Sequence, residues 1–150
     1  LSVTNTHKLD LAAAEVADAI RHARNEAIRR GAPVGFRNEG SAKMDIDLYR
    51  LDTSTTPATP VYDIEHPFTH GPYESSLGTH PYARMSDLTR SAEFYGTCTQ
   101  TKFIYFDSSG VPRCGEPDTV LLKRYEMTVV HGDYARVVTL EGITGRVTVQ

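Results

Sequence analysis

Hydrophobic and polar positions in the first part of the chain follow the period of an α-helix. Apolar side chains recur at intervals of three and four residues, which places them along one side of a helix. The apolar stripe consists of Leu9, Ala13, Val16, Ile20, Ala23 and Ala27. We expect Thr6 to be the N-cap and Gly31 to end the helix, because glycine readily adopts the left-handed conformation found there, and Pro33 prevents continuation.

The remainder of the chain has the patterns of strands and turns. Residues 44–51 alternate between the two faces expected of a half-buried strand, with Met44, Ile46 and Leu48 on one face. Two prolines within residues 52–60 indicate a loop. Strands are expected at 34–36, 44–51, 102–106, 119–123, 125–130, 134–140 and 146–150. Successive strands with short turns predict an antiparallel sheet whose apolar face the helix covers, an α+β fold.

Residues 61–101 are the hardest part of the chain to interpret. Prolines and glycines interrupt the region, which favours loops and short strands. Residues 84–94 have a weak pattern that would allow a helical turn or two. We expect so long an irregular segment to be held by its own aromatic side chains or by a disulfide.

Length and composition indicate one ordinary globular domain. The 150 residues predict a single domain at 1–150, with a helix at 1–31, a β-rich part at 32–150 and a long insertion near 40–98. A net charge of −3 argues against a protein that coats nucleic acid or an anionic membrane. The chain has no apolar run of membrane-spanning length, no cleavable signal at Leu1 and no initiator methionine, which suggests a mature or truncated form.

The two cysteines, Cys98 and Cys114, are too few for a zinc site and too far apart for a CxxC redox motif. A disulfide formed in an oxidising compartment is the favoured interpretation, and two buried thiols are the alternative. Closing a loop of this size stabilises a fold by roughly 3 kcal/mol.

The end of the helix, residues 23–31, reads Ala-Arg-Asn-Glu-Ala-Ile-Arg-Arg-Gly, and Pro33-Val34 follows. This segment resembles the pattern AR-x-EAI-x-R-G-x-x-V of type IV pilin-like proteins, specifically the GspH/FimT group of minor pilins and pseudopilins. Residues 106–110 resemble the family's F-x-x-x-G turn, and residues 137–140 with 144–147 resemble its closing strands. Together these segments cover about a third of the chain, whereas the Tyr-, His- and Pro-rich region 40–98 departs from the family's short form.

The resemblance implies a pilin-like fold and a structural role without enzymatic activity or a cofactor. Family members carry a leader that a prepilin peptidase removes, then an apolar half-helix that anchors the subunit in the bacterial inner membrane and later packs in the filament core; methylation is also implied. The implied partners are other major and minor pilins or pseudopilins of a type IV pilus or a type II secretion pseudopilus. The subunit would face the periplasm and then the cell surface, as a low-abundance initiating or tip component. The small residues Ala12, Ala13, Ala17 and Ala19 suit close packing against the sheet or neighbouring helices.

A metal-dependent enzyme is one alternative. His66, His70 and His80 lie in one region with Asp63 and Glu65, which are ligand types for a divalent metal. However, the prolines of that region exclude the helix that would give the spacing meaning, and no nucleophile-elbow, zinc-protease or phosphate-loop motif occurs. We therefore expect no catalytic, metal or cofactor site.

DNA binding for uptake is a second alternative, since some relatives in the FimT branch bind DNA near a C-terminal Gly-Arg motif. Gly145-Arg146 is present, but Thr148 stands where a second basic residue would help, so the candidate contacts are Arg136 and Arg146. The helix also has a basic face, interpreted as a solvated surface or a subunit contact. That face comprises Arg21, Arg24, Arg29 and Arg30, with Asp18 and Glu26.

Aromatic residues of the insertion raise a third question. They are Tyr62, Phe68, Tyr73, Tyr82 and Tyr95. They predict either an exposed surface for adhesion or for the next subunit, or a small core beneath a long loop, and both can hold for different rings.

Overall fold

The longest element of the computed structural model, which describes residues 2–150, is the helix α1 (Ser2–Arg30). It ends as expected, because Gly31 follows it with a φ of 63°. It begins earlier than expected, so the prediction of Thr6 as N-cap is wrong. No glycine or proline stands between its first residue and Thr6 to interrupt the helix there.

All strands pair antiparallel and form two sheets. The first sheet has the order β3-β2-β1-β6-β7, and β4 pairs with β2. Its strands are β1 (Val34–Arg37), β2 (Asp45–Asp52), β3 (Thr59–Val61), β4 (Glu74–Ser76), β6 (Phe103–Phe106) and β7 (Pro112–Cys114). The second has the order β10-β9-β8-β5, formed by β5 (Asp87–Phe94), β8 (Leu122–His131), β9 (Tyr134–Glu141) and β10 (Val147–Val149). A short 3₁₀ helix, η1 (Gly40–Ala42), precedes β2.

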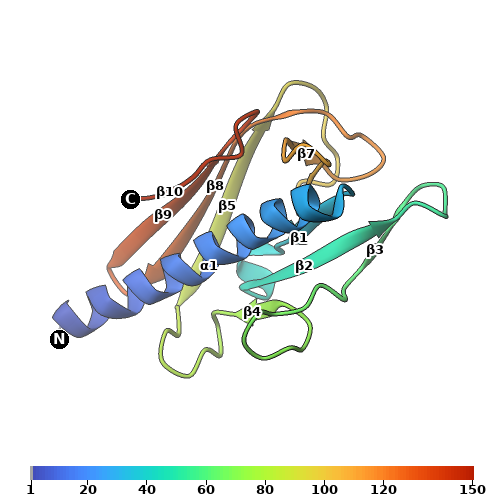
Figure 1. Ribbon diagram of the computed structural model, residues 1–150. Helices are drawn as coiled ribbons and strands as arrows, with labels where there is room; N and C mark the ends of the chain where they lie inside the picture. Colours follow the sequence, from blue (N-terminus) through green and yellow to red (C-terminus); the bar gives the residue numbers. More distant parts are fainter. Residues whose placement is uncertain (1) are drawn as a thin grey trace.

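The helix α1 packs across both sheets and joins them into one core. It contacts β1, β2 and β6 of the first sheet and β8, β9 and β10 of the second (Figure 1). All six residues of the apolar stripe are fully buried, as are Ala12, Ala17 and Ala19. The apolar and small side chains of α1 are therefore used against its own sheets, and the N-terminal turns of the helix extend past the ends of β8 and β9 (Figure 1).

Residues 84–94 do not form a helical turn, contrary to expectation. Most of them form β5, which pairs with β8 along its length. Leu88 is buried, but Arg90 shares its side of the strand, and this charge obscured the alternation in the sequence. The strand predicted at 125–130 and the last two residues of the one predicted at 119–123 form a single strand, β8, which has a neighbouring strand on each side; residues 119–121 lie outside it.

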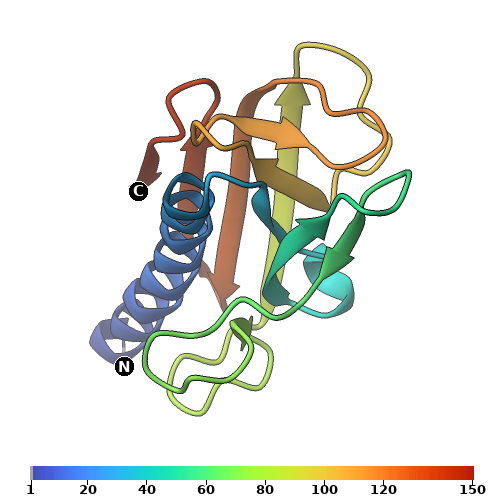
Figure 2. The ribbon, with the colours of Figure 1, turned by 45° about the vertical axis from the view of Figure 1, so that its right-hand side comes forward.

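The part of the insertion between β2 and β5 pairs with β2 at two places. After β2 the chain returns as β3, which pairs with the C-terminal half of β2, and then as β4, which pairs with the N-terminal half. The loops around β4, in green and yellow-green, consequently lie beside the N-terminal half of α1 (Figure 2). Ile64, Tyr73 and Leu77 bury their side chains there and extend the core.

Candidate functional site

Sequence segments far apart in the chain meet at the C-terminal half of α1. Arg24 donates from Nε to the carbonyl oxygen of Gly110, at 3.1 Å. Gly145 lies against both groups with a φ of 70°, and a Cβ atom on it would lie 2.8 Å from the Gly110 oxygen. The helix end, the F-x-x-x-G turn and the Gly-Arg turn therefore form one junction, which we call the Arg24 junction.

The basic face of α1 is largely engaged within the chain. Arg21 donates from Nη2 to the Val147 carbonyl oxygen at 3.0 Å, which fastens β10 to the helix. Arg29 and Arg30 contact Glu26 at 2.7 and 2.8 Å. The hydrogen bond from Arg29, followed by that from Arg30, lowers the pKa of Glu26 to about 2 although burial opposes this.

The insertion and the solvent side of α1 enclose a groove of about 880 Å³. The helix contributes Glu15, Asp18 and His22 to its lining. The facing loops contribute histidines, aromatic rings and Glu74 of β4. This side of the helix lies opposite the apolar stripe, and Tyr73 belongs both to the core and to the lining of the groove.

Two turns of identical pattern, His-Pro-aromatic, border this groove. The Nδ1 atom of His66 accepts the backbone N–H groups of Phe68 and Thr69, at 3.1 and 3.3 Å. His80 Nδ1 accepts those of Tyr82 and Ala83 in the same way, at 3.3 and 3.0 Å. We call residues 66–69 and 80–83 the twin turns. In both, the imidazole takes the place of an Asx side chain, and the intervening proline has no N–H that needs a partner.

Contacts with α1 hold the twin turns in place. His80 Nε2 lies 3.4 Å from Glu15 Oε1, and Ser75 donates to the other oxygen of the same carboxylate. Tyr73 packs its ring between His22 and His66, with centroid distances of 5.0 and 4.5 Å. Burial lowers the pKa of His22, partly offset by Glu26, and burial raises the pKa of Tyr73 to about 12. Both rings therefore stay uncharged at neutral pH.

The aromatic side chains of the insertion divide between buried and exposed positions. Tyr73 is buried, whereas Phe68 is 85% exposed and Tyr82 is 64% exposed. Tyr62 is partly covered by packing edge-on against the buried Tyr49. Tyr95 is exposed and lies away from the groove, with the Lys123 ammonium 5.0 Å from its ring centroid.

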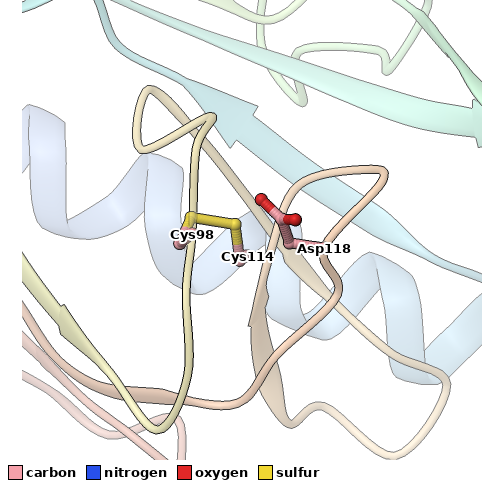
Figure 3. A group of neighbouring side chains, drawn as sticks. All are labelled: Cys98, Cys114 and Asp118. Carbon is pink, nitrogen blue, oxygen red and sulfur yellow. A yellow bond between two sulfur atoms is a disulfide. The ribbon is translucent and has the colours of Figure 1, made fainter.

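The histidines suggested as metal ligands are engaged separately. His70 pairs with Glu65 at 2.6 Å, while His66 and His80 bind backbone groups in different turns. Within residues 2–150 the only group of three potential ligand atoms in close proximity is Cys98, Cys114 and Asp118 (Figure 3). Its two sulfur atoms form the disulfide, which confirms the predicted pairing, and Asp118 accepts hydrogen bonds from Thr99.

The two candidate DNA contacts lie in different surroundings. Arg136 pairs with Asp10 of α1 at 3.2 Å. Arg146 is exposed and follows the turn after β9, where its carbonyl accepts the Glu141 N–H. Five strand positions separate Arg136 from Glu141, so the two arginines lie at opposite ends of β9, roughly 16 Å apart along the strand.

Comparison with protein families identifies the type of protein to which this arrangement belongs. The family model described as type II transport protein GspH matches residues 12–142. The chain belongs to the GspH family. The resemblance to GspH/FimT minor pilins and pseudopilins, expected from the helix end and the C-terminal segments, is therefore confirmed. Those family-like segments are the ones that meet in the Arg24 junction.

Solved structures of two minor subunits share the fold of this GspH family member. The minor pseudopilin EpsH from the type II secretion system of Vibrio cholerae matches with a TM-score of 0.59 and 12% identity, over 95% of this chain and 93% of that chain. The type IV minor pilin FimU from Pseudomonas aeruginosa PAO1 matches with a TM-score of 0.56 and 16% identity, over 99% of this chain and 92% of that chain. Both likenesses show the pilin-like arrangement of one N-terminal helix on antiparallel sheets. No curated protein sequence matches the chain.

Among residues 2–150, no helix combines the length and the apolar character that a membrane-crossing segment requires.

Proposed function

We propose that this GspH family member is a minor subunit of a type IV pilus or a type II secretion pseudopilus, and that it acts in the assembly or initiation of the filament and not as an enzyme. The observation that supports this role most directly is the division of α1 into two sides. Its apolar stripe is fully buried against both sheets, while its other side lines an open groove. A subunit of a helical filament needs two different surfaces that meet those of its neighbours.

The proposal extends to the location of the subunit and its other partners. An apolar segment ahead of α1 would anchor it in the inner membrane, with the globular part facing the periplasm, and other pilins or pseudopilins would be its neighbours. The projection of the N-terminal turns of α1 beyond the strands agrees with this direction of attachment (Figure 1).

Deletion of the gene in the native host tests the role. We expect loss or shortening of surface filaments, or loss of type II secretion, and recovery when the full-length gene is restored. The subunit should also co-purify with other pilin-fold proteins after chemical cross-linking. A deletion strain with normal filaments and secretion, together with no cross-linked pilin, would contradict the proposal.

The same strain distinguishes the two alternatives. If the subunit serves DNA uptake, the deletion strain should lose natural transformation but keep its filaments. The purified protein should then also retard the mobility of duplex DNA, and both added salt and Arg146→Ala should weaken this binding. If the subunit is a surface adhesin, the deletion strain should lose attachment to surfaces while the number of filaments stays normal.

A further inference from the structure

We infer that the groove bordered by the twin turns binds a basic segment of a neighbouring filament subunit, with Phe68 and Tyr82 as its aromatic contacts. This inference rests on the proposed filament role and names a partner chemistry for one surface. Phe68 is 85% exposed and Tyr82 is 64% exposed, and both line the same groove, so exposed aromatic surface is gathered at one place as it is at interaction sites.

Both exposed rings are held ready for a partner. The backbone of each twin turn is fixed by two hydrogen bonds to its histidine, at 3.0 to 3.3 Å. Each histidine also packs near its own aromatic ring, with centroids 5.9 Å apart for His66 and Phe68 and 4.5 Å apart for His80 and Tyr82. Aromatic side chains positioned in advance lose little freedom on binding, which makes them effective contact residues.

The charge of the groove favours a basic partner. Three carboxylates and one arginine line it. Glu15 accepts a hydrogen bond from Ser75 and lies 3.4 Å from His80, whereas Glu74 has no ion pair among the described residues. Arg21 is the one arginine in the lining, and its guanidinium is directed to the Val147 carbonyl and to Asp18, at 3.0 and 3.6 Å. A lysine or arginine entering the groove would meet carboxylates and the faces of aromatic rings, and both attract a cation.

The dimensions of the groove favour a polypeptide. Its helical lining runs from Leu11 to Asn25, a rise of about 21 Å at 1.5 Å per residue. That length corresponds to roughly six extended residues. The groove is therefore long enough for a segment of a neighbouring subunit.

Site-specific photo-cross-linking in the native host tests the inference. A photoreactive residue replaces Phe68 or Tyr82 in the full-length chain, and a third variant carries it at Tyr95, an exposed aromatic position outside the groove. We expect adducts with another pilin-fold subunit from positions 68 and 82, in at least fivefold higher yield than from 95. Glu74→Lys should lower that yield at least threefold, whereas Glu93→Lys, at an exposed position on β5, should leave it unchanged.

A second measurement separates binding from folding. The double variant Phe68→Ala/Tyr82→Ala should retain the wild-type midpoint of urea unfolding, because both side chains are exposed, and should reduce filament number or secretion at least threefold. Absent or equal cross-linking at the three positions, with a clear deletion phenotype, would overturn the groove inference and leave the proposed function standing. A gene deletion that changes neither filaments nor secretion would contradict both the groove inference and the proposed function.

Discussion

Gly145 shows how a single residue maintains the Arg24 junction. It combines a φ of 70° with close approach to the Gly110 carbonyl and the Arg24 side chain. We expect Gly145→Ala to lower the free energy of unfolding by about 2 kcal/mol, from backbone strain and from displacement of neighbouring atoms. Gly132→Ala is the matched control, because its φ is 61° but its Cβ would have no atom within 4 Å. If urea unfolding shows the same loss of stability in Gly145→Ala and Gly132→Ala, the close contact at Gly145 does not contribute to stability.

Asp47 should make the stability of the protein depend on pH. Burial, followed by the nearby Asp45 and Glu74, raises the pKa of Asp47 from 3.8 to about 7. Between these two values the folded state binds more protons than the unfolded state, so the free energy of unfolding should fall as the pH rises through this window. We expect Asp47→Asn to remove that decrease. The free energy of unfolding of the variant should therefore rise relative to that of the wild type between about pH 4 and about pH 8.

Urea unfolding at both pH values measures the effect of Asp47→Asn. Asp133→Asn, in the exposed turn between β8 and β9, is the control and should leave the pH dependence unchanged. An Asp47→Asn variant that keeps the wild-type pH dependence would show that this carboxyl group titrates normally.

At the scale of elements, each twin turn depends on an acceptor supplied by its first residue. In His66→Ala the N–H groups of Phe68 and Thr69 lose their partner, so we expect hydrogen exchange at these two amides to accelerate about tenfold, equivalent to roughly 1.4 kcal/mol. His66→Asn should retain near wild-type exchange, because an Asn oxygen accepts the same pair of donors. Equal acceleration in both variants would contradict the assigned role of Nδ1.

The disulfide constrains the segment between β5 and β7. It joins residues 16 apart in the sequence and brings the 95–101 loop against β7. We expect Cys98→Ser/Cys114→Ser to lower the free energy of unfolding by about 3 kcal/mol, chiefly because the unfolded chain gains freedom. Urea unfolding of the double variant beside the oxidised wild type measures this, and an unchanged midpoint would show that other contacts hold the segment.

Local periodicity was sufficient to predict some elements and insufficient for others. The stripe of α1 and the alternation in β2 are visible in the sequence because each element buries one continuous face. The pairing of β5 with β8 is not visible, because about thirty residues separate the two strands and Arg90 interrupts the apolar pattern. The strands β3, β4 and β7 have three residues each, which is too short for a periodic signal.

For the whole molecule, α1 is the element that joins the two sheets. Ala17 is fully buried, so Ala17→Leu should force the helix away from the strands and lower the free energy of unfolding by about 1–3 kcal/mol. Ala14→Leu introduces the same side chain on the exposed side of α1 and should change stability little. Thermal unfolding of the two variants measures the difference, and similar midpoints would mean that the interface with the sheets accommodates extra volume.

The groove illustrates how much of a site can be predicted from sequence. The two His-Pro-aromatic segments are present in the printed sequence, and their repetition was the available signal. Their convergence on α1 is a tertiary effect, since β3 and β4 both return to β2 and direct the intervening loops to the helix. The pairing of Arg136 with Asp10 is likewise a long-range contact, which the sequence pattern could not predict.

The bonds from Arg21 and Arg24 to main-chain carbonyl oxygens have a consequence for divergence within the family. A carbonyl acceptor is present at Val147 whichever side chain that position carries, so Arg21 keeps its hydrogen-bond partner when the residue mutates. Position 110 differs, because it has a φ of 82° and a Cβ atom there would lie 3.1 Å from the Arg24 Nε that donates to its carbonyl oxygen. The contact between Arg21 and β10 therefore depends on the course of the main chain at position 147 and not on the side chain there.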